Sequence, residues 1–297
     1  MTTASGILDG DAMKALDMLV AARADRRPCP PVRGLLPAGD VDAAYAVQAA
    51  WVADQVAAGA RVIGRKIGLT NPAVQAQFGV DRPDFGVLFD DMDCAPGAPI
   101  DTARTLQPKI EAEIAFVLKE DLAGPVIGPA EVAAATAYVV AALEIVDSRI
   151  AGWDIGIVDT IADNGSSGLF VLGDRRQELG HLDLAECAMT LRRRRAGGVR
   201  GTGGVRGPDG VPGVDGAGGA GGEVVSTGTG ASILGHPLAA VAWLAAAVRD
   251  HGRPLRAGEV VLSGSLGPMV TVSPGDAFQA DISGVGQVSA AFAGGTS

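Results

Sequence analysis

After residue 60 the sequence consists of short apolar runs that Gly, Pro and Asp residues interrupt. The runs are RVIGRKIGL, IEAEIAFVL, AYVVAALEIV, EVVLSG and MVTVS. Apolar runs of this length, bounded by turn-forming residues, are typical of β-strands. Helical patterns interrupt them over only two stretches, from residue 129 to about 136 and from 237 to about 250. We therefore predict an α+β fold rather than a regular alternation of strands and helices.

The first sixty residues have a helical pattern instead. From residue 11 to about 27 the large apolar residues recur at spacings of three and four, which places them on one helix face. A second helix is expected to begin after Asp40 as N-cap and to stop at Gly59. We predict an N-terminal helical segment over residues 1–60 and a catalytic β-rich domain over residues 61–297.

Between residues 192 and 222 the composition changes, and from Gly198 to Gly222 a glycine stands at every third position. Only two prolines occur in this stretch, which is too few for a stable collagen-like triple helix. We predict a flexible insert at the tip of a hairpin, because the flanking runs AMTL and EVVS resemble strands. The four arginines at its root are interpreted as a solvated charge run, with contact to an anion or nucleic acid as the alternative.

Composition disfavours several classes of protein. A net charge of -10 would repel nucleic acid, so we expect no such partner. The three cysteines form no C-x-x-C pair, which disfavours a disulfide framework and a thiolate zinc site. No stretch has the pattern of a secretion signal or the length of a membrane span. We therefore expect a cytoplasmic protein without a membrane partner.

Three glutamates are the candidate metal ligands. In a strand, alternation places Glu111 and Glu113 on one face, whereas Ile110 and Ile114 lie on the other. Taken alone, two such glutamates could equally belong to a solvent-facing strand. Glu144 adds a third carboxylate within an apolar run, where a buried glutamate needs a partner or a metal. Oxygen ligands favour Mg²⁺ or Mn²⁺, and the scarcity of nearby His and Cys argues against zinc.

Other polar residues are candidates for binding or proton transfer. Lys66 lies between glycines in an apolar strand, where it could bind a substrate carboxylate or extend to the surface. Asp84 in DRPDFG could be a turn residue or a catalytic group. The stretch VDTIADNGSSG could form a plain turn or present donors, including Ser166, to an oxyanion. A serine hydrolase is disfavoured because neither serine stands in a G-x-S-x-G motif.

Five motifs in order resemble the 2-keto-4-pentenoate hydratase family of the fumarylacetoacetate hydrolase superfamily. They are GRKIGLTNPAVQAQFGVDRPDFGVLF, QPKIEAEIAFVL, ALEIVDSRIAGWDIGIVDTIADNGSSG, STGTGASILGHPLAAVAWLA and LSGSLGPMV. The resemblance implies a β-rich mixed-sheet roll with a metal held by Glu111, Glu113 and Glu144. It also implies an active-site Lys66, Asp84 and Ser166. The chain departs from the family by its insert and by Gly165, where family members commonly have alanine.

The resemblance implies hydration of 2-hydroxypenta-2,4-dienoate to 4-hydroxy-2-oxopentanoate in the meta-cleavage degradation of aromatic compounds. Decarboxylation of 4-oxalocrotonate by the same type of site is the alternative. The segment VDRPDFG resembles the hydratase branch of the family more than the decarboxylase branch. The alternative that is not an enzyme is a catalytically silent subunit that binds a partner enzyme. We expect a small 2-oxo or 2-hydroxydienoic acid as substrate, a homo-oligomer, and association with another enzyme of the pathway.

Overall fold

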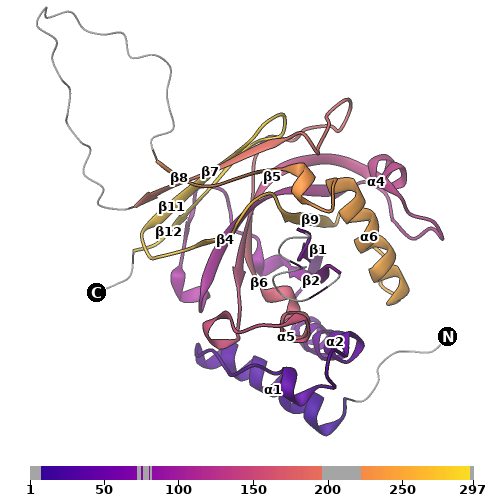
Figure 1. Cartoon of the computed structure of the whole chain (residues 1–297), viewed down its shortest axis with the longest axis vertical. Helices are drawn as coiled ribbons and strands as arrows, with labels where there is room; N and C mark the ends of the chain where they lie inside the picture. The colour runs from indigo at the N-terminus through magenta and orange to yellow at the C-terminus, as the bar shows by residue number, and fades with distance from the viewer. Residues whose placement is uncertain (1–7, 72–74, 76–79, 81, 196–221, 295–297) are drawn as a thin grey trace, which may run out of the picture.

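The computed structural model describes residues 8–71, 75, 80, 82–195 and 222–294. Two β-sheets form the body of this part of the chain, and helices lie beside them (Figure 1). The first sheet has seven strands in the order β2-β1-β9-β4-β5-β6, with β10 paired to β4. The second has five strands in the order β3-β12-β11-β7-β8. The predicted α+β, β-rich fold with mixed sheets is confirmed.

The strands of the first sheet are β1 (Val62–Gly68), β2 (Asp84–Phe89), β4 (Pro108–Leu118), β5 (Thr136–Asp147), β6 (Ser167–Leu172), β9 (Val260–Ser265) and β10 (Val270–Thr271). Those of the second are β3 (Pro99–Ile100), β7 (Ala188–Arg195), β8 (Glu223–Thr229), β11 (Asp276–Ile282) and β12 (Gly286–Phe292). The α-helices are α1 (Gly10–Asp25), α2 (Val41–Ala57), α4 (Pro129–Ala135), α5 (Ile157–Ala162) and α6 (Pro237–Asp250).

The long antiparallel pair β4 and β5 separates two hydrophobic cores. Ile110, Ile114 and the other even-numbered apolar residues of β4 belong to a core shared with the second sheet and α6. Ala115, on the opposite face, belongs to a core shared with the N-terminal helices. Strand alternation places Glu111 and Glu113 together on the face of Ala115, opposite Ile110 and Ile114, as predicted. The structure adds that this face is on the side of the N-terminal helices.

The two N-terminal helices form where the sequence predicts them. The side chains of Asp9 and Asp40 accept hydrogen bonds from the first-turn backbone and cap α1 and α2. Trp51 of α2 packs edge-on against Phe89 of β2, with ring centroids 5.5 Å apart. The helices thus share a core with the first sheet. The division of the chain at residue 60 into a helical segment and a catalytic domain stays a prediction.

The predicted helices α4 and α6 are both present, whereas α5 was not predicted. His236 caps α6 through its Nδ1 atom, which accepts a hydrogen bond from the Leu238 backbone N–H. By length and composition, Gly230–Asp250 is the single described segment that could cross a membrane. Val241 and Leu244 are buried in the core, and this packing accounts for the apolar composition.

The strands that flank the glycine-rich insert pair as expected. β7 and β8 are antiparallel neighbours, which agrees with a hairpin. Residues 196–221, which include most of the insert, lie outside the described residues. Within the arginine run at its root, Arg193 forms an ion pair with Glu223 at 2.9 Å.

Gly64 offers a test of the packing between β1 and β9. A Cβ atom at this position would lie 2.0 Å from the carbonyl oxygen of Val260 on the parallel neighbour strand. Gly64→Ala should therefore lower the free energy of unfolding by about 1 to 3 kcal/mol, as overpacking does. Gly34→Ala is the matched control, since nothing lies within 4 Å of its added Cβ. Urea denaturation measures both variants, and equal stability of the two would contradict this packing.

Candidate active site

Three carboxylates meet on the buried face of β4 and β5. Glu111 and Glu144 are directly paired across the strands, and Glu113 lies two residues along β4. The three side chains offer oxygen atoms that all lie within 4.8 Å of one another. The Glu113 Oε2 atom accepts a hydrogen bond from the Gly264 backbone at 2.8 Å. Among the described residues, Glu113 Oε1 and both Glu144 oxygens have no hydrogen-bond partner.

The electrostatics of this cluster favour a bound cation. Burial, together with the Glu144 charge, raises the pKa of Glu111 to about 7. Burial and both neighbouring carboxylates raise the pKa of Glu113 well above its ordinary value. Burial also raises the pKa of Glu144, although the nearby Lys66 ammonium opposes this. A hard divalent cation removes both the repulsion and the need to take up protons, so these unpartnered oxygens fit an oxygen-ligated metal.

Lys66 is placed against the cluster by β1. Its Nζ atom lies 3.2 Å from Glu144 Oε1, close enough for an ion pair although the two groups are not aligned for a hydrogen bond. Burial disfavours the charged amine, but Glu144, Asp84 and the other carboxylates outweigh burial and raise the pKa of Lys66. The side chain is 4 % exposed, so the interpretation that it extends to the surface is wrong.

Asp84 is the first residue of β2 and lies opposite Gly68 of β1. Thr160 of α5 donates a hydrogen bond to Asp84 Oδ2 at 3.1 Å, whereas Oδ1 is buried without a partner among the described residues. Burial raises the pKa of Asp84, and Lys66 partly opposes the increase. A Cβ atom added at Gly68 would lie 2.1 Å from Asp84 Oδ1, so a larger residue there would displace the Asp84 carboxylate. The interpretation of Asp84 as a turn residue is therefore wrong.

Ser166 is held by a short loop with an unusual backbone. Asn164, Gly165 and Ser166 have φ angles of 56°, 62° and 52°, all in the left-handed region. The Asn164 side chain fixes the loop, because it accepts a hydrogen bond from the Val87 backbone N–H and donates one to the Val87 carbonyl. The Ser166 hydroxyl is buried without a hydrogen-bond partner in the described part of the chain. It is therefore free to bind a substrate or water.

A cavity of about 370 Å³ joins these residues. Its polar lining includes Lys66, Asp84, Glu111, Thr160 and Ser166, and its apolar lining includes Val146, Trp153, Ile155, Pro268 and Met269. Glu113 and Glu144 do not line the cavity and are fully buried. The motif LSGSLGPMV contributes Ser265, Gly267, Pro268 and Met269 to the wall. The volume and the mixed lining suit a small organic molecule.

Among the residues of the cavity that sequence reasoning missed, Lys109 and Thr160 are polar and close to the candidate site. Lys109 lies on the same face of β4 as Glu111, and its Nζ atom is 4.1 Å from the centre of the Trp153 ring. Strand alternation could have identified Lys109, because it precedes Glu111 by two positions. No sequence signal marks Thr160, whose role depends on the position of α5 beside β2. Lys109 and Trp153 together form a cationic and aromatic part of the wall.

Other polar residues of VDTIADNGSSG have structural roles. Asp159 forms an ion pair with Arg33 at 2.7 Å and accepts a hydrogen bond from the Gly156 backbone. Asp163 is bound by the guanidinium of Arg149. The Ser167 hydroxyl donates to the Asn164 carbonyl oxygen at 2.8 Å. These contacts hold the segment that carries Ser166.

Comparison with known proteins identifies the family. Residues 61–293 match the family described as fumarylacetoacetate (FAA) hydrolase C-terminal. The chain belongs to the fumarylacetoacetate hydrolase family. The "2-keto-4-pentenoate hydratase 2" of Dechloromonas aromatica (strain RCB) is 47% identical over 94% of this chain and 96% of the relative. The "2-keto-4-pentenoate hydratase" of Burkholderia vietnamiensis (strain G4 / LMG 22486) is 48% identical over 91% of this chain and 93% of the relative.

Solved structures include a similar decarboxylase. The "4-oxalocrotonate decarboxylase from Pseudomonas putida G7 - complexed with magnesium and adipate" has a TM-score of 0.83 and 31% identity, over 97% of this chain and 99% of that protein. The predicted resemblance to the hydratase family within this superfamily is confirmed.

Removal of one carboxylate tests the metal site. Glu144→Gln keeps the shape of the side chain but removes the charge of one candidate ligand, so the affinity for Mn²⁺ should fall by more than about 100-fold. Isothermal titration calorimetry measures the affinity, and circular dichroism verifies folding. Glu120→Gln, at an exposed position at the end of β4, is the control and should bind Mn²⁺ as the unmodified protein does. Equal affinity of both variants would exclude Glu144 as a ligand.

Metal affinity should depend on pH. Because the pKa of Glu111 in the metal-free protein is about 7, this carboxyl is mostly protonated at pH 6 and mostly ionised at pH 8. A metal must displace the proton, so affinity should be at least about tenfold weaker at pH 6 than at pH 8. Calorimetry in buffers of different ionisation enthalpy also counts the released protons. A flat affinity with no proton release over this range would contradict the assignment.

Proposed function

We propose that this protein is a divalent-metal-dependent hydratase, a hydro-lyase that converts 2-hydroxypenta-2,4-dienoate to 4-hydroxy-2-oxopentanoate. The observation that carries the choice of reaction is the 47–48% identity, over nearly the whole chain, to relatives named 2-keto-4-pentenoate hydratase. The complete cluster of three carboxylates beside a lysine supports the enzyme class. The reaction belongs to the meta-cleavage degradation of aromatic compounds.

Glu111, Glu113 and Glu144 would hold Mg²⁺ or Mn²⁺, which supplies Lewis acidity toward the 2-oxygen of the substrate. Support for a divalent ion comes from the donor set and from the magnesium named with the similar decarboxylase. The choice between Mg²⁺ and Mn²⁺ follows from the oxygen ligands, which suit hard cations.

Lys66 and Asp84 have different roles in this proposal: Lys66 binds the negatively charged substrate, and Asp84 transfers protons. The Lys66 ammonium keeps its charge and binds the substrate carboxylate at the cavity floor. Hydration first removes the 2-hydroxyl proton and adds a proton at C5, which leaves a 2-oxo-3-enoate. The hydroxyl of water then adds to C4, and the proton that the water loses is balanced by one added at C3. Asp84 suits proton transfer, because its pKa is raised by burial and its Oδ1 atom is unpartnered among the described residues. Thr160 holds Asp84 in place, and the Ser166 hydroxyl orients the water.

Decarboxylation of 4-oxalocrotonate is the second candidate, because a similar structure carries that name. Lys109 in the cavity wall offers a cation for a second substrate carboxylate. The lower identity of 31%, against 47–48% for the hydratases, favours hydration. A catalytically silent subunit is disfavoured because all six predicted site residues are present. Four of them line the cavity, and Glu113 and Glu144 lie within 4.8 Å of the Glu111 carboxylate.

We further infer a cytoplasmic location, which the free thiols of Cys29, Cys94 and Cys187 support. The homo-oligomeric state and the association with another enzyme of the pathway stay predictions.

A substrate comparison tests the proposed reaction. The purified protein with Mg²⁺ or Mn²⁺ is incubated with 2-hydroxypenta-2,4-dienoate and, separately, with 4-oxalocrotonate. The expected result is loss of the dienol absorbance with formation of 4-hydroxy-2-oxopentanoate, measured by proton NMR. Release of CO₂ from 4-oxalocrotonate without any hydrated product from the dienoate would reverse the assignment.

The role of Asp84 predicts a separation of activity from metal binding. Asp84→Asn should lower kcat by about 100-fold or more, the size of a general acid–base contribution, while Mn²⁺ affinity changes little. Asp17→Asn, on the exposed side of α1, is the control and should retain full activity. Steady-state kinetics and calorimetry on the same preparations measure both quantities. An Asp84→Asn enzyme with normal kcat would remove Asp84 from the proposed proton transfer.

A further inference from the structure

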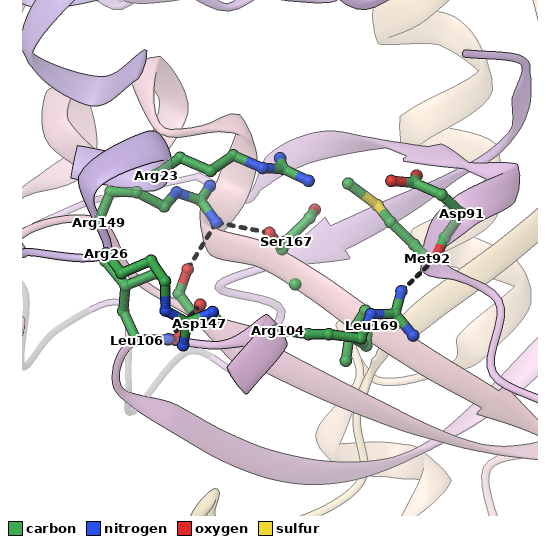
Figure 2. A pocket seen from close by; sticks show the side chains of 11 residues that line it. Arg23, Arg26, Asp91, Met92, Arg104, Leu106, Asp147, Arg149, Ser167 and Leu169 are labelled. Carbon is green, nitrogen blue, oxygen red and sulfur yellow. Dashed lines mark hydrogen bonds between the residues drawn. The ribbon is translucent and has the colours of Figure 1, made fainter. Parts of the chain in front are cut away.

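A second cavity, of about 190 Å³, shares no lining residue with the catalytic cavity. Four arginines line it: Arg23 of α1, Arg26 at the end of α1, Arg104 and Arg149 (Figure 2). Figure 2 shows the guanidinium of Arg23 beside that of Arg149, whereas Arg104 lies on the other side of the cavity near Asp91. Segments that are distant in the sequence thus bring four cations to one place.

Arg23 lies in this cavity without a polar partner. It makes no hydrogen bond or ion pair with the described residues, and its guanidinium lies 5.3 Å from the centre of the Trp51 ring. Burial lowers the pKa of Arg23, and the neighbouring Arg149 charge lowers it further. A partly buried cation beside another cation is unfavourable unless an anion approaches both.

The buried acids near Arg23, Asp147 and Asp163, already accept hydrogen bonds from other groups. Asp147 accepts hydrogen bonds from the backbone N–H groups of Leu106 and Gln107 at 2.6 to 2.9 Å. The Arg149 guanidinium binds Asp163 and the carbonyl oxygens of Asp147 and Ser167. Both acids favour the charge of Arg23, but neither forms an ion pair or a hydrogen bond with it among the described residues.

The other two arginines retain unused donors. Arg26 donates from Nη2 to the Thr105 carbonyl at 3.1 Å, and Arg104 donates to the Asp91 carbonyl and to Cys94 Sγ. Neither arginine has an ion pair with a described carboxylate. Asp91, which is exposed, and Asp147, which is buried, are the two acids that line the cavity. Among the described residues, Arg23, Arg26 and Arg104 form no ion pair with either acid.

We propose that Arg23, Arg26 and Arg104 form a binding site for a small oxyanion, namely a phosphate or the carboxylates of a small diacid. The planar guanidinium fork matches both groups and binds them through two parallel hydrogen bonds. The cavity volume accommodates an anion of this size. Because the cavity is separate from the catalytic one, this site does not depend on the proposed reaction.

The test uses the full-length metal-loaded enzyme with inorganic phosphate and, in a second arm, succinate. Both are titrated by calorimetry against chloride at equal ionic strength. Arg104→Met alters an exposed side chain and should leave folding intact. The double variant Arg23→Met/Arg104→Met should bind the anion more than tenfold more weakly than the unmodified enzyme. Arg27→Met, an exposed arginine outside the cavity, is the control and should bind normally. Tighter binding of phosphate than of succinate would identify a phosphate site, and the reverse would identify a dicarboxylate site.

The catalytic cavity could also attract these probes, so Lys66→Met is measured in parallel. Retained binding in Lys66→Met together with loss in the arginine variants supports the second site. Binding that is lost in Lys66→Met but unchanged in Arg104→Met would place the anion in the catalytic cavity and overturn the proposal. No binding of either probe to the unmodified enzyme would overturn it as well.

Discussion

The pairing of Glu111 with Glu144 across β4 and β5 is the constraint on which the rest of the site depends. It places two carboxylates side by side on a buried strand face, and Glu113 adds a third. Lys66 can compensate only part of this negative charge. Leaving buried ions unpaired costs several kcal/mol each, so the fold is stable with ionised ligands only when a cation binds among them.

The elements around the carboxylate cluster position the groups that are proposed to bind the substrate and to transfer protons. β1 and β2 present Lys66 and Asp84 to the same cavity, and α5 contributes Thr160 to hold Asp84. Asn164 ties the left-handed loop to the backbone of Val87. Gly165 suits this loop because its φ of 62° is unfavourable for a residue with a Cβ.

Much of the strand pattern could be predicted from the sequence. The structure brings the six candidate site residues together, and their roles stay predictions. Alternation fixed the face of Glu111 and Glu113, and the apolar run around Glu144 indicated burial. Local sequence could not decide whether Lys66 is buried or whether Asp84 forms a turn, because both depend on the pairing of β1 with β2. The roles of Thr160 and Arg23 depend on helix positions that result from tertiary packing.

The central claim is that the three glutamates hold one divalent metal ion. Anomalous diffraction from crystals of the protein grown with Mn²⁺ tests it most directly. The account predicts a single strong anomalous peak bounded by carboxylate oxygens of Glu111, Glu113 and Glu144. A peak at another site, or none at these residues under saturating Mn²⁺, would contradict it.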